Sequence, residues 1–320
     1  MSRLFFYIKK GFADLFNPLI YSPVYGEDTL QYYYLKYELP SLLDGRSQKF
    51  SFDDNNIPII PHYIDSSSKK EGGEGFHYYP IAIGQLALAY LHDYLDSKKA
   101  DSLTTFLTYA SWFVDNQEDN GTWLAQTNVD KYGVEAPWVS AMTQGRALSV
   151  LLRAYRMTGD NKYLDSASLA FEALLSDSSF VKYYKEGLFL LEYPSKSTPR
   201  ILNGFIFALY GIVDFSRAVP GDERCKEILE SSRRSLLEHL PLYDNGFWSV
   251  YDLDHIDYQK TVNISTVHYH FIHISQLRTL ADIYDDSRFN EVATRWDGYY
   301  RNKLSLFRIY FVKARRLFKL

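Results

Sequence analysis

Two kinds of segment alternate along most of the chain, and this alternation is the feature that most limits its fold. From about residue 79 onward, stretches with apolar residues at helical spacing are each followed by a short polar turn and a second amphipathic stretch. The first stretches of the four pairs are 80–95, 140–160, 202–219 and 270–286. Repeats of this kind predict stacked helical hairpins, because a single hairpin cannot bury its own apolar face.

The segments between the pairs have a different texture. They combine Asn-Gly or Glu-Gly dipeptides with aromatic and β-branched residues, which is typical of β-hairpins, and they cover 119–138, 182–195 and 243–265. Each would lie at the same end of a ring of helix pairs. We therefore predict a mainly α fold, an incomplete (α/α) barrel or toroid of helical hairpins over residues 79–320, with β-hairpins lining a mouth that holds the site.

Residues 1–78 do not share this pattern. They contain several prolines, a helix-like stretch over 29–45, and a turn signal at Asn55 and Asn56 between two apolar runs. We predict that this part forms an N-terminal cap with a β-hairpin.

Charge and cysteine content exclude several classes of partner. The net charge is -4, which provides no basic field for a nucleic-acid backbone, so no nucleic-acid partner is expected. Cys225 is the only cysteine, which excludes an internal disulfide and a thiolate metal cluster. The N-terminus has an apolar run of only five residues, too short for a secretion signal or a membrane span, and this predicts a cytoplasmic protein.

The chain is rich in aromatic residues, with 28 Tyr and 21 Phe. Tyrosine rings serve sugar-binding sites as stacking platforms with a polar tip, although packing between helices is the simpler use.

The last residues, 302–320, carry six basic residues and no acidic one. Leu304, Phe307 and Phe311 recur there at helical spacing, followed by Ala314 and Phe318. Such a basic amphipathic helix predicts peripheral contact with an anionic membrane, here its inner face. The alternative is a terminal helix that packs this aromatic face on the barrel.

Three short clusters of polar residues follow predicted hairpins and precede helices. The first is Glu192 with Tyr193 and, further on, Asn203; the second runs from Tyr251 to His255. In the third, His268, Tyr269, His270 and His273 lie within six residues. These histidines suit substrate orientation or acid–base chemistry, a buried hydrogen-bonded role, or a metal site, although no nearby Cys or Glu-x-x-His supports the last.

A tyrosine that acts as a base needs a lowered pKa, because its ordinary pKa is about 10. Cations must then lie nearby, and we predict Arg200 and Arg146 for this role.

Four strings in order carry a resemblance to a known family. They are APWVSAMTQGRALSVLLRAYRMTGD, LEYPSKSTPRILNGFIFALYGIVDF, NGFWSVYDLDHI and YHFIHISQLRTLADI. Together they resemble the C-terminal helical domain of the D-glucuronyl C5-epimerases, over roughly residues 76–300.

The resemblance implies an isomerase that converts D-glucuronate to L-iduronate units in a heparosan-like or heparan-type polysaccharide. It implies no cofactor, no required metal, and a homodimer. Its catalytic residues would be Glu192, Tyr193, Tyr251 and Tyr269. Its substrate-binding residues would be Tyr79, Gln144, Asn203, His270 and His273.

The chain departs from the family pattern at one position. Asp254 stands where animal-type members carry an arginine, so Arg200 and Arg146 are the predicted partners of the substrate carboxylate.

Three other functions fit the same residues. A uronate polysaccharide lyase of the (α/α) toroid type would begin with the same proton abstraction. A glycosidase would need two carboxylates, such as Glu192 with Asp252 or Asp254. A carbohydrate-binding protein without catalysis would keep the fold and the aromatic residues alone.

Overall fold

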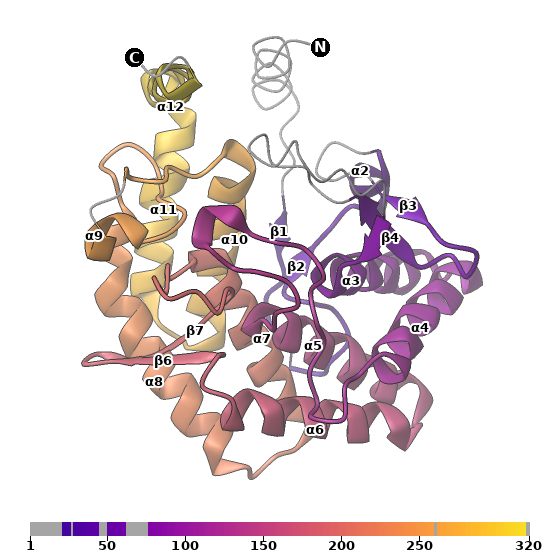
Figure 1. The fold of residues 1–320 in the computed structure, drawn as a ribbon. Helices are drawn as coiled ribbons and strands as arrows, with labels where there is room; N and C mark the ends of the chain where they lie inside the picture. Colours follow the sequence, from indigo (N-terminus) through magenta and orange to yellow (C-terminus); the bar gives the residue numbers. More distant parts are fainter. Residues whose placement is uncertain (1–20, 27, 45–49, 62–75, 259–260, 318–320) are drawn as a thin grey trace.

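The computed structural model describes residues 21–26, 28–44, 50–61, 76–258 and 261–317. Four helix pairs form the body of the described chain, as the repeats predict (Figure 1). The pairs are α3 (Pro80–Ser97) with α4 (Ala100–Asp115), α5 (Ala141–Thr158) with α6 (Asn161–Ser176), α7 (Leu202–Ala218) with α8 (Glu223–His239), and α10 (Val267–Ile283) with α11 (Ser287–Arg301).

The remaining elements are short, apart from a terminal helix. The helices are α2 (Leu39–Leu43), α9 (Asp254–Tyr258), α12 (Lys303–Leu317) and the 3-10 turns η1 (Asp130–Tyr132) and η2 (Leu240–Tyr243). The strands are β1 (Ser22–Pro23), β2 (Leu35–Lys36), β3 (Ser51–Phe52), β4 (Pro58–Pro61), β5 (Phe76–Tyr78), β6 (Val181–Tyr184) and β7 (Gly187–Leu190). They pair antiparallel as β1-β2, β3-β4-β5 and β6-β7.

The first helix of each pair lies inside and the second outside. Helix α5 is buried at every position from Ala141 to Ala154, and α7 is buried from Leu202 to Phe215. Outer helices bury a single stripe, as α11 does with Phe289, Ala293 and Trp296. Figure 1 shows α4, α6 and α8 along the rim of the molecule and α5 and α7 within it.

The inner helices pack side by side in chain order: α3 on α5, α5 on α7, and α7 on α10. The segment 21–37 contacts both ends of this row. The Tyr33 backbone N–H donates to Nε2 of His92 on α3 at 2.8 Å, and Thr279 Oγ1 of α10 donates to the Tyr34 carbonyl. The chain is thus an incomplete (α/α) barrel, as predicted, and this segment bridges its open side.

Parts of the predicted N-terminal cap, residues 1–20 and 62–75, lie outside the described residues. The predicted hairpin around Asn55 and Asn56 is confirmed as β3-β4. The helix expected over 29–45 is wrong except for α2. Neighbouring tyrosines Tyr33 and Tyr34 are both fully buried, which an extended chain between two packed surfaces allows.

The predicted hairpins between the pairs differ in regularity. Residues 182–195 contain the continuous hairpin β6-β7, as expected. Residues 119–138 have only isolated bridges, and η1 interrupts them. Residues 243–265 likewise have isolated bridges interrupted by α9. These two loops are therefore irregular, and their aromatic residues serve packing more than strand pairing.

Glycine and aspartate residues cap helix ends at turns within pairs. Gly159 ends α5 in the left-handed conformation, with φ 72°, and the Asp160 side chain then accepts from the backbone N–H of Lys162 to cap α6. Asp222 and Asp286 cap α8 and α11 in the same way. Each pair is consequently tight, and the chain enters along an inner helix and returns along an outer one. The three loops that connect one pair to the next lie at the end where the inner helices begin, which we call the loop end.

Helices α5 and α7 touch through their backbones. A Cβ atom built on Gly211 would lie 2.4 Å from the Gly145 Cα, and one built on Gly145 would lie 2.5 Å from the Ala208 Cα. No side chain fits at either position without moving a helix.

Gly145→Ala is therefore expected to lower the free energy of unfolding by about 1–3 kcal/mol, since the added methyl group forces the two helices apart. Urea denaturation measures the change. Gly298→Ala is the matched control, because Gly298 lies on α11 and a Cβ added there would have no atom within 4 Å. That variant is expected to be neutral or about 0.5–1 kcal/mol more stable. Equal effects of the two substitutions would contradict the close backbone contact.

Candidate active site

Five predicted site residues come from different segments at the loop end. Tyr79 is the residue before α3, and Glu192 and Tyr193 follow β7. Tyr251 lies in the loop between η2 and α9, and Tyr269 lies in the first turn of α10. Because the inner helices all begin at this end, the loops before them bring residues far apart in sequence together.

The tyrosines form one aromatic cluster. Tyr193 stacks on Tyr132 with 4.9 Å between ring centroids, and Trp138 lies 5.2 Å from it. Tyr251 meets Tyr269 edge-on at 4.8 Å. Tyr79 packs against the same group. We call Tyr79, Tyr132, Trp138, Tyr193, Tyr251 and Tyr269 the tyrosine cluster.

Glu192 is a buried carboxylate of this site, only 5% exposed. Its Oε2 lies over the first turn of α7, where a Cβ built on Gly204 would be 2.1 Å away. Glycine at position 204 is thus what makes room for the carboxylate. Among the described residues Oε2 has no hydrogen-bond partner.

Burial raises the pKa of Glu192 to about 7, although a hydrogen bond from Tyr193 and the charge of Lys131 oppose the shift. A carboxyl group with this pKa can both accept and donate a proton at neutral pH. It is the group of the site best placed for acid–base chemistry.

The pKa values of the neighbouring tyrosines are raised, whereas a tyrosine that acts as a base would need a lowered pKa. Burial, together with the charge of Glu192 and of other tyrosines, raises the pKa of Tyr193 and of Tyr251 well above 10. Burial and the Asp252 carboxylate likewise raise the pKa of Tyr132. These three hydroxyl groups keep their protons at neutral pH, and those of Tyr132 and Tyr193 already donate to the carboxylates of Asp252 and Glu192.

Lys131 is a site cation that sequence reasoning missed. Its Nζ donates to Asp252 Oδ2 at 2.9 Å and lies 4.6 Å from the Tyr132 ring centroid and 5.7 Å from that of Tyr251. Its side chain is 51% exposed, so the ammonium group is open to solvent. A single lysine in a turn carries no sequence signal of such a role.

Asp252 organises this side of the site. Its Oδ2 accepts hydrogen bonds from Lys131, from the Tyr132 hydroxyl at 2.8 Å and from Asn263 at 2.5 Å. These donors occupy the carboxylate, which argues against its use as the second carboxylate of a glycosidase.

The two arginines predicted to bind the substrate carboxylate are held by other partners. Arg200 is paired with Asp257 at 2.7 Å and lies over the Tyr184 ring. Arg146 is fully buried, donates to the Tyr37 hydroxyl and packs 3.8 Å from the Phe207 ring centroid. Arg146 Nε and Nη1 have no hydrogen-bond partner among the described residues, but the side chain is fully buried, and neither arginine acts on the pKa of Glu192.

His270 and His273, which were predicted to bind substrate, are instead packed among other side chains. His270 stacks on Trp248 at 3.8 Å, and its ring nitrogens pair with Ser249 and the Trp296 carbonyl. Ser249 also meets Nδ1 of His273. Burial lowers the pKa of His270 to about 3 and that of His273 well below its usual value. Both rings are therefore neutral and belong to the helix core.

Gln144 and Asn203, the other two predicted substrate-binding residues, are also buried, but in different surroundings. The Gln144 amide donates to the carbonyls of Gly121 and Ala170, between the helices. Asn203 lies in the first turn of α7 beside Gly204, and its backbone carbonyl accepts from the Gln276 side chain. Only Asn203 borders the site. Within the part of the chain that the structure describes, no three His, Cys, Asp or Glu side chains gather closely enough to hold a metal ion.

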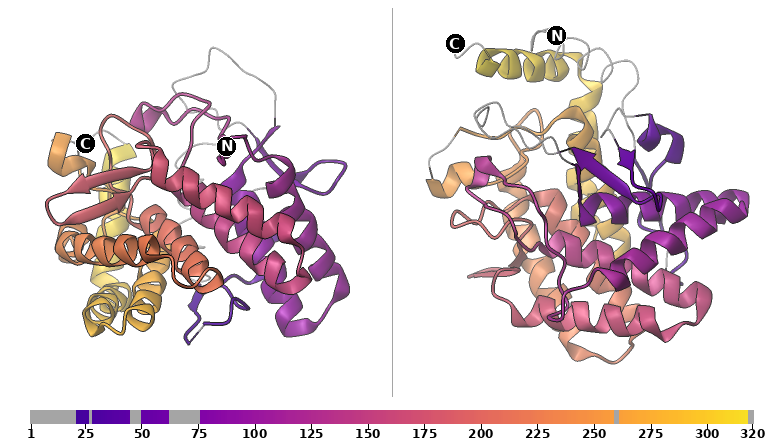
Figure 2. Two further views of the ribbon diagram at one scale, coloured as in Figure 1. Left: turned by 90° about the horizontal axis from the view of Figure 1, so that it is seen from below. Right: turned by 45° about the vertical axis from the view of Figure 1, so that its right-hand side comes forward.

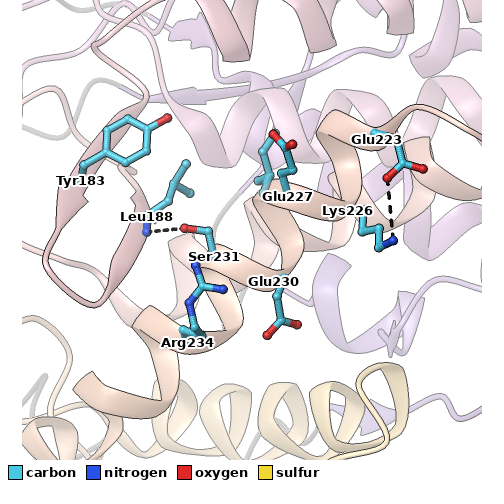
Figure 3. A pocket seen from close by; sticks show the side chains of 9 residues that line it. Tyr183, Leu188, Glu223, Lys226, Glu227, Glu230, Ser231 and Arg234 are labelled. Atoms are coloured by element: carbon cyan, nitrogen blue, oxygen red, sulfur yellow. Dashed lines mark hydrogen bonds and ion pairs between the residues drawn. The ribbon is translucent and has the colours of Figure 1, made fainter.

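A pocket of about 590 Å³ lies where the β6-β7 hairpin meets α8 (Figure 3). Figure 3 shows Glu223, Lys226, Glu227, Glu230 and Arg234 around it, so charges of both signs are mixed there. It contains none of the predicted site residues.

A sequence model of the D-glucuronyl C5-epimerase C-terminus matches residues 117–298, more than half of the 320 residues. The chain belongs to the D-glucuronyl C5-epimerase family. The matched region includes Glu192, Tyr193, Tyr251 and Tyr269, whereas Tyr79 precedes it.

Two curated relatives of this epimerase-family chain are informative. The D-glucuronyl C5-epimerase of Caenorhabditis elegans is 34% identical over 212 residues, which are 61% of this chain and 34% of that protein. An uncharacterized protein of Methanocaldococcus jannaschii is 34% identical over 128 residues, 38% of this chain and 41% of its own. The chain thus spans about a third of the length of the first relative and about two fifths of the second.

Two solved structures that are similar to this epimerase-family chain are glycoside hydrolases of family 76. A mannosidase from Bacteroides thetaiotaomicron VPI-5482 has a TM-score of 0.40 and 14% identity, with 67% of this chain and 60% of that chain covered. A second, from a bovine strain of the same species, has a TM-score of 0.43 and 12% identity, with 68% and 46% covered.

Proposed function

We propose that this chain epimerises C5 of D-glucuronate units in a heparosan-like polysaccharide, with Glu192 on one face of the sugar and Tyr269 on the other. The observation that carries the proposal is Glu192, a buried carboxyl group with a pKa of about 7 within the tyrosine cluster of a chain from this family. The heparosan-type substrate and the homodimer remain predictions from the resemblance.

The reaction begins at a weakly acidic carbon–hydrogen bond. Glu192, as carboxylate, takes the C5 proton, and the electron pair of the C–H bond moves into the substrate carboxylate to give an enediolate. This second negative charge must be balanced by donors already in place. Lys131 and the protonated hydroxyl of Tyr251 are the described groups suited to this role, whereas the Tyr193 hydroxyl donates to Glu192.

Inversion then requires a proton from the opposite face. The Tyr269 hydroxyl donates it to C5, which leaves a tyrosinate and a protonated Glu192. Proton exchange with solvent restores both groups for the next turnover. The contact of Tyr251 with the Tyr269 ring, and the effect of both Glu192 and Tyr269 on its pKa, support a role for Tyr251 close to both groups.

Product analysis tests the proposal. Heparosan-type polymer incubated with the full chain is expected to give iduronate signals in the NMR spectrum, with no new ultraviolet absorbance. Absorbance from a new carbon–carbon double bond would instead identify a lyase, and binding without any product would identify a carbohydrate-binding protein.

The pH dependence of catalysis should follow Glu192. Below its pKa of about 7 the carboxyl group is protonated and cannot take the C5 proton. On glucuronate polymer, kcat/KM is therefore expected to fall by about tenfold for each pH unit below 7. Lys131→Met removes a charge that lowers this pKa, so the acid limb should move to higher pH.

Lys226→Met provides the control for that shift, because Lys226 is 82% exposed on α8 and its nearest carboxylate is Glu223. Its pH profile should match that of the unmodified chain. An acid limb that stays in place in Lys131→Met would mean that Lys131 does not act on the base.

A further inference from the structure

The terminal helix α12 has apolar residues on two faces, and only one face is covered. Ile309 is 1% exposed and belongs to the main core, and Ser305 on the same side is 6% exposed. Leu304, Phe307 and Phe311 face the other way and are 77%, 73% and 59% exposed. The structure therefore excludes the arrangement in which this aromatic face packs on the barrel.

The charge of this segment is opposite to that of the rest of the chain. Residues 302–320 carry six basic residues and no acidic one, whereas the whole chain has 35 basic and 39 acidic residues. The other residues thus carry a net charge of -10. An anionic surface would attract this segment and repel the remainder, which fixes an orientation.

The helix starts at the loop end. Helix α11 runs back along α10, Tyr300 packs on Phe271 near the start of α10, and a single residue separates α11 from α12. The Arg308 guanidinium lies 3.9 Å from the ring centroid of Phe247, in the loop that also carries Tyr251. Figure 2, in its right-hand view, shows α12 lying across the top of the molecule beyond α11.

We propose that α12 docks the protein on an anionic lipid bilayer, with Leu304, Phe307 and Phe311 inserted at the interface and the basic residues near the headgroups. Exposed aromatic residues next to basic ones are what interfacial helices use. A polyanionic sugar would use the cations but has no place for three apolar side chains. A second copy of this chain would bring two basic helices together.

The bilayer contact is peripheral. Within the described residues, no helix combines the length and the apolar character needed to cross a membrane. The contact also does not depend on the proposed catalysis, since it involves none of the tyrosine cluster.

Co-sedimentation of the full chain with vesicles tests the proposal. Binding is expected to vesicles of phosphatidylcholine and phosphatidylglycerol in equal parts, to be absent with phosphatidylcholine alone, and to weaken with added salt. The double variant Phe307→Ser with Phe311→Ser should lower the partition coefficient by about tenfold or more. Lys303→Glu with Arg308→Glu should lower it by a similar factor, about tenfold or more.

Tyr183→Ser is the matched control, because Tyr183 is 74% exposed on β6 and lies off this helix. It should bind vesicles like the unmodified chain, and the α12 variants should keep their far-ultraviolet circular dichroism and their activity on soluble polymer. Equal binding to neutral and anionic vesicles would overturn the proposal. So would loss of self-association in the Phe variants without any change in vesicle binding, which would identify a second copy as the occupant.

Discussion

Glu192→Gln is expected to lower kcat for C5 epimerisation by about 10²- to 10⁴-fold, the usual contribution of a positioned acid–base group. Glutamine keeps the shape of the side chain over Gly204 but cannot take the C5 proton. Because the substituted group is an isostere, the folded structure and its unfolding midpoint should change little. The rate of iduronate formation measures the effect.

Gly204→Ala provides a second route to the same result. The added methyl group would lie 2.1 Å from Oε2 of Glu192, so the carboxylate must move away from its position. Activity should fall although Glu192 itself is intact. Glu223→Gln is the control, because Glu223 is 77% exposed on α8. If Glu192→Gln retained nearly full activity, the base would have to be another group.

Asp214→Ala is expected to destabilise the fold by about 3–5 kcal/mol, because it leaves a buried charge without its partner. Arg153 and Asp214 join α5 and α7 with both side chains fully buried. Asp214 also accepts the Tyr34 hydroxyl at 2.7 Å, and Arg153 donates to the Tyr32 carbonyl. This ion pair therefore anchors the segment that bridges the open side of the barrel.

Glu172→Ala is the control for that effect. The pair of Glu172 with Arg224 is exposed, at 57% and 48%, and its loss should cost at most about 1 kcal/mol. Urea denaturation of the two variants gives the comparison. Similar small losses in both would show that segment 21–37 contributes little to the stability of the barrel.

The sequence predicts the helix row well, because its signals are local. Capping residues such as Asp160 after Gly159 mark helix ends directly, and the apolar spacing of the four pairs corresponds to the four pairs in the structure. The irregular loops are harder. Aromatic residues in 119–138 resemble strand residues, yet Tyr132 and Trp138 pack around Tyr193. Such packing between distant segments leaves no trace in a local pattern.

For the candidate site too, residues in the loops could be predicted from the sequence, whereas residues within the inner helices could not. Glu192, Tyr193, Tyr251 and Tyr269 come together because each lies just before or within the first turn of an inner helix or in the loop that leads to one. Side chains within the inner helices cannot be placed by such reasoning. A helix that is apolar all round has no polar face to indicate which side meets the site. Sequence reasoning therefore assigns Gln144, Arg146 and His273 to substrate, although they lie in the helix packing.

The positively charged residue of the site, Lys131, could not be predicted from the sequence either. Arg200 is attractive in sequence because it follows Glu192 closely, but the fold pairs it with Asp257. Lys131, which precedes Glu192 by sixty-one positions, reaches the site through a loop fold that depends on Asp252.

The central claim is that Glu192 and Tyr269 exchange protons with C5 from opposite faces of the sugar. The most direct test is to incubate the Tyr269→Phe variant with heparosan-type polymer in deuterated water and to measure deuterium at C5 by NMR. Glu192 alone can remove and return a proton on one face, so the variant is expected to give glucuronate labelled with deuterium at C5 and no iduronate. Iduronate formed at the unmodified rate by Tyr269→Phe would contradict the assignment of Tyr269 to the opposite face.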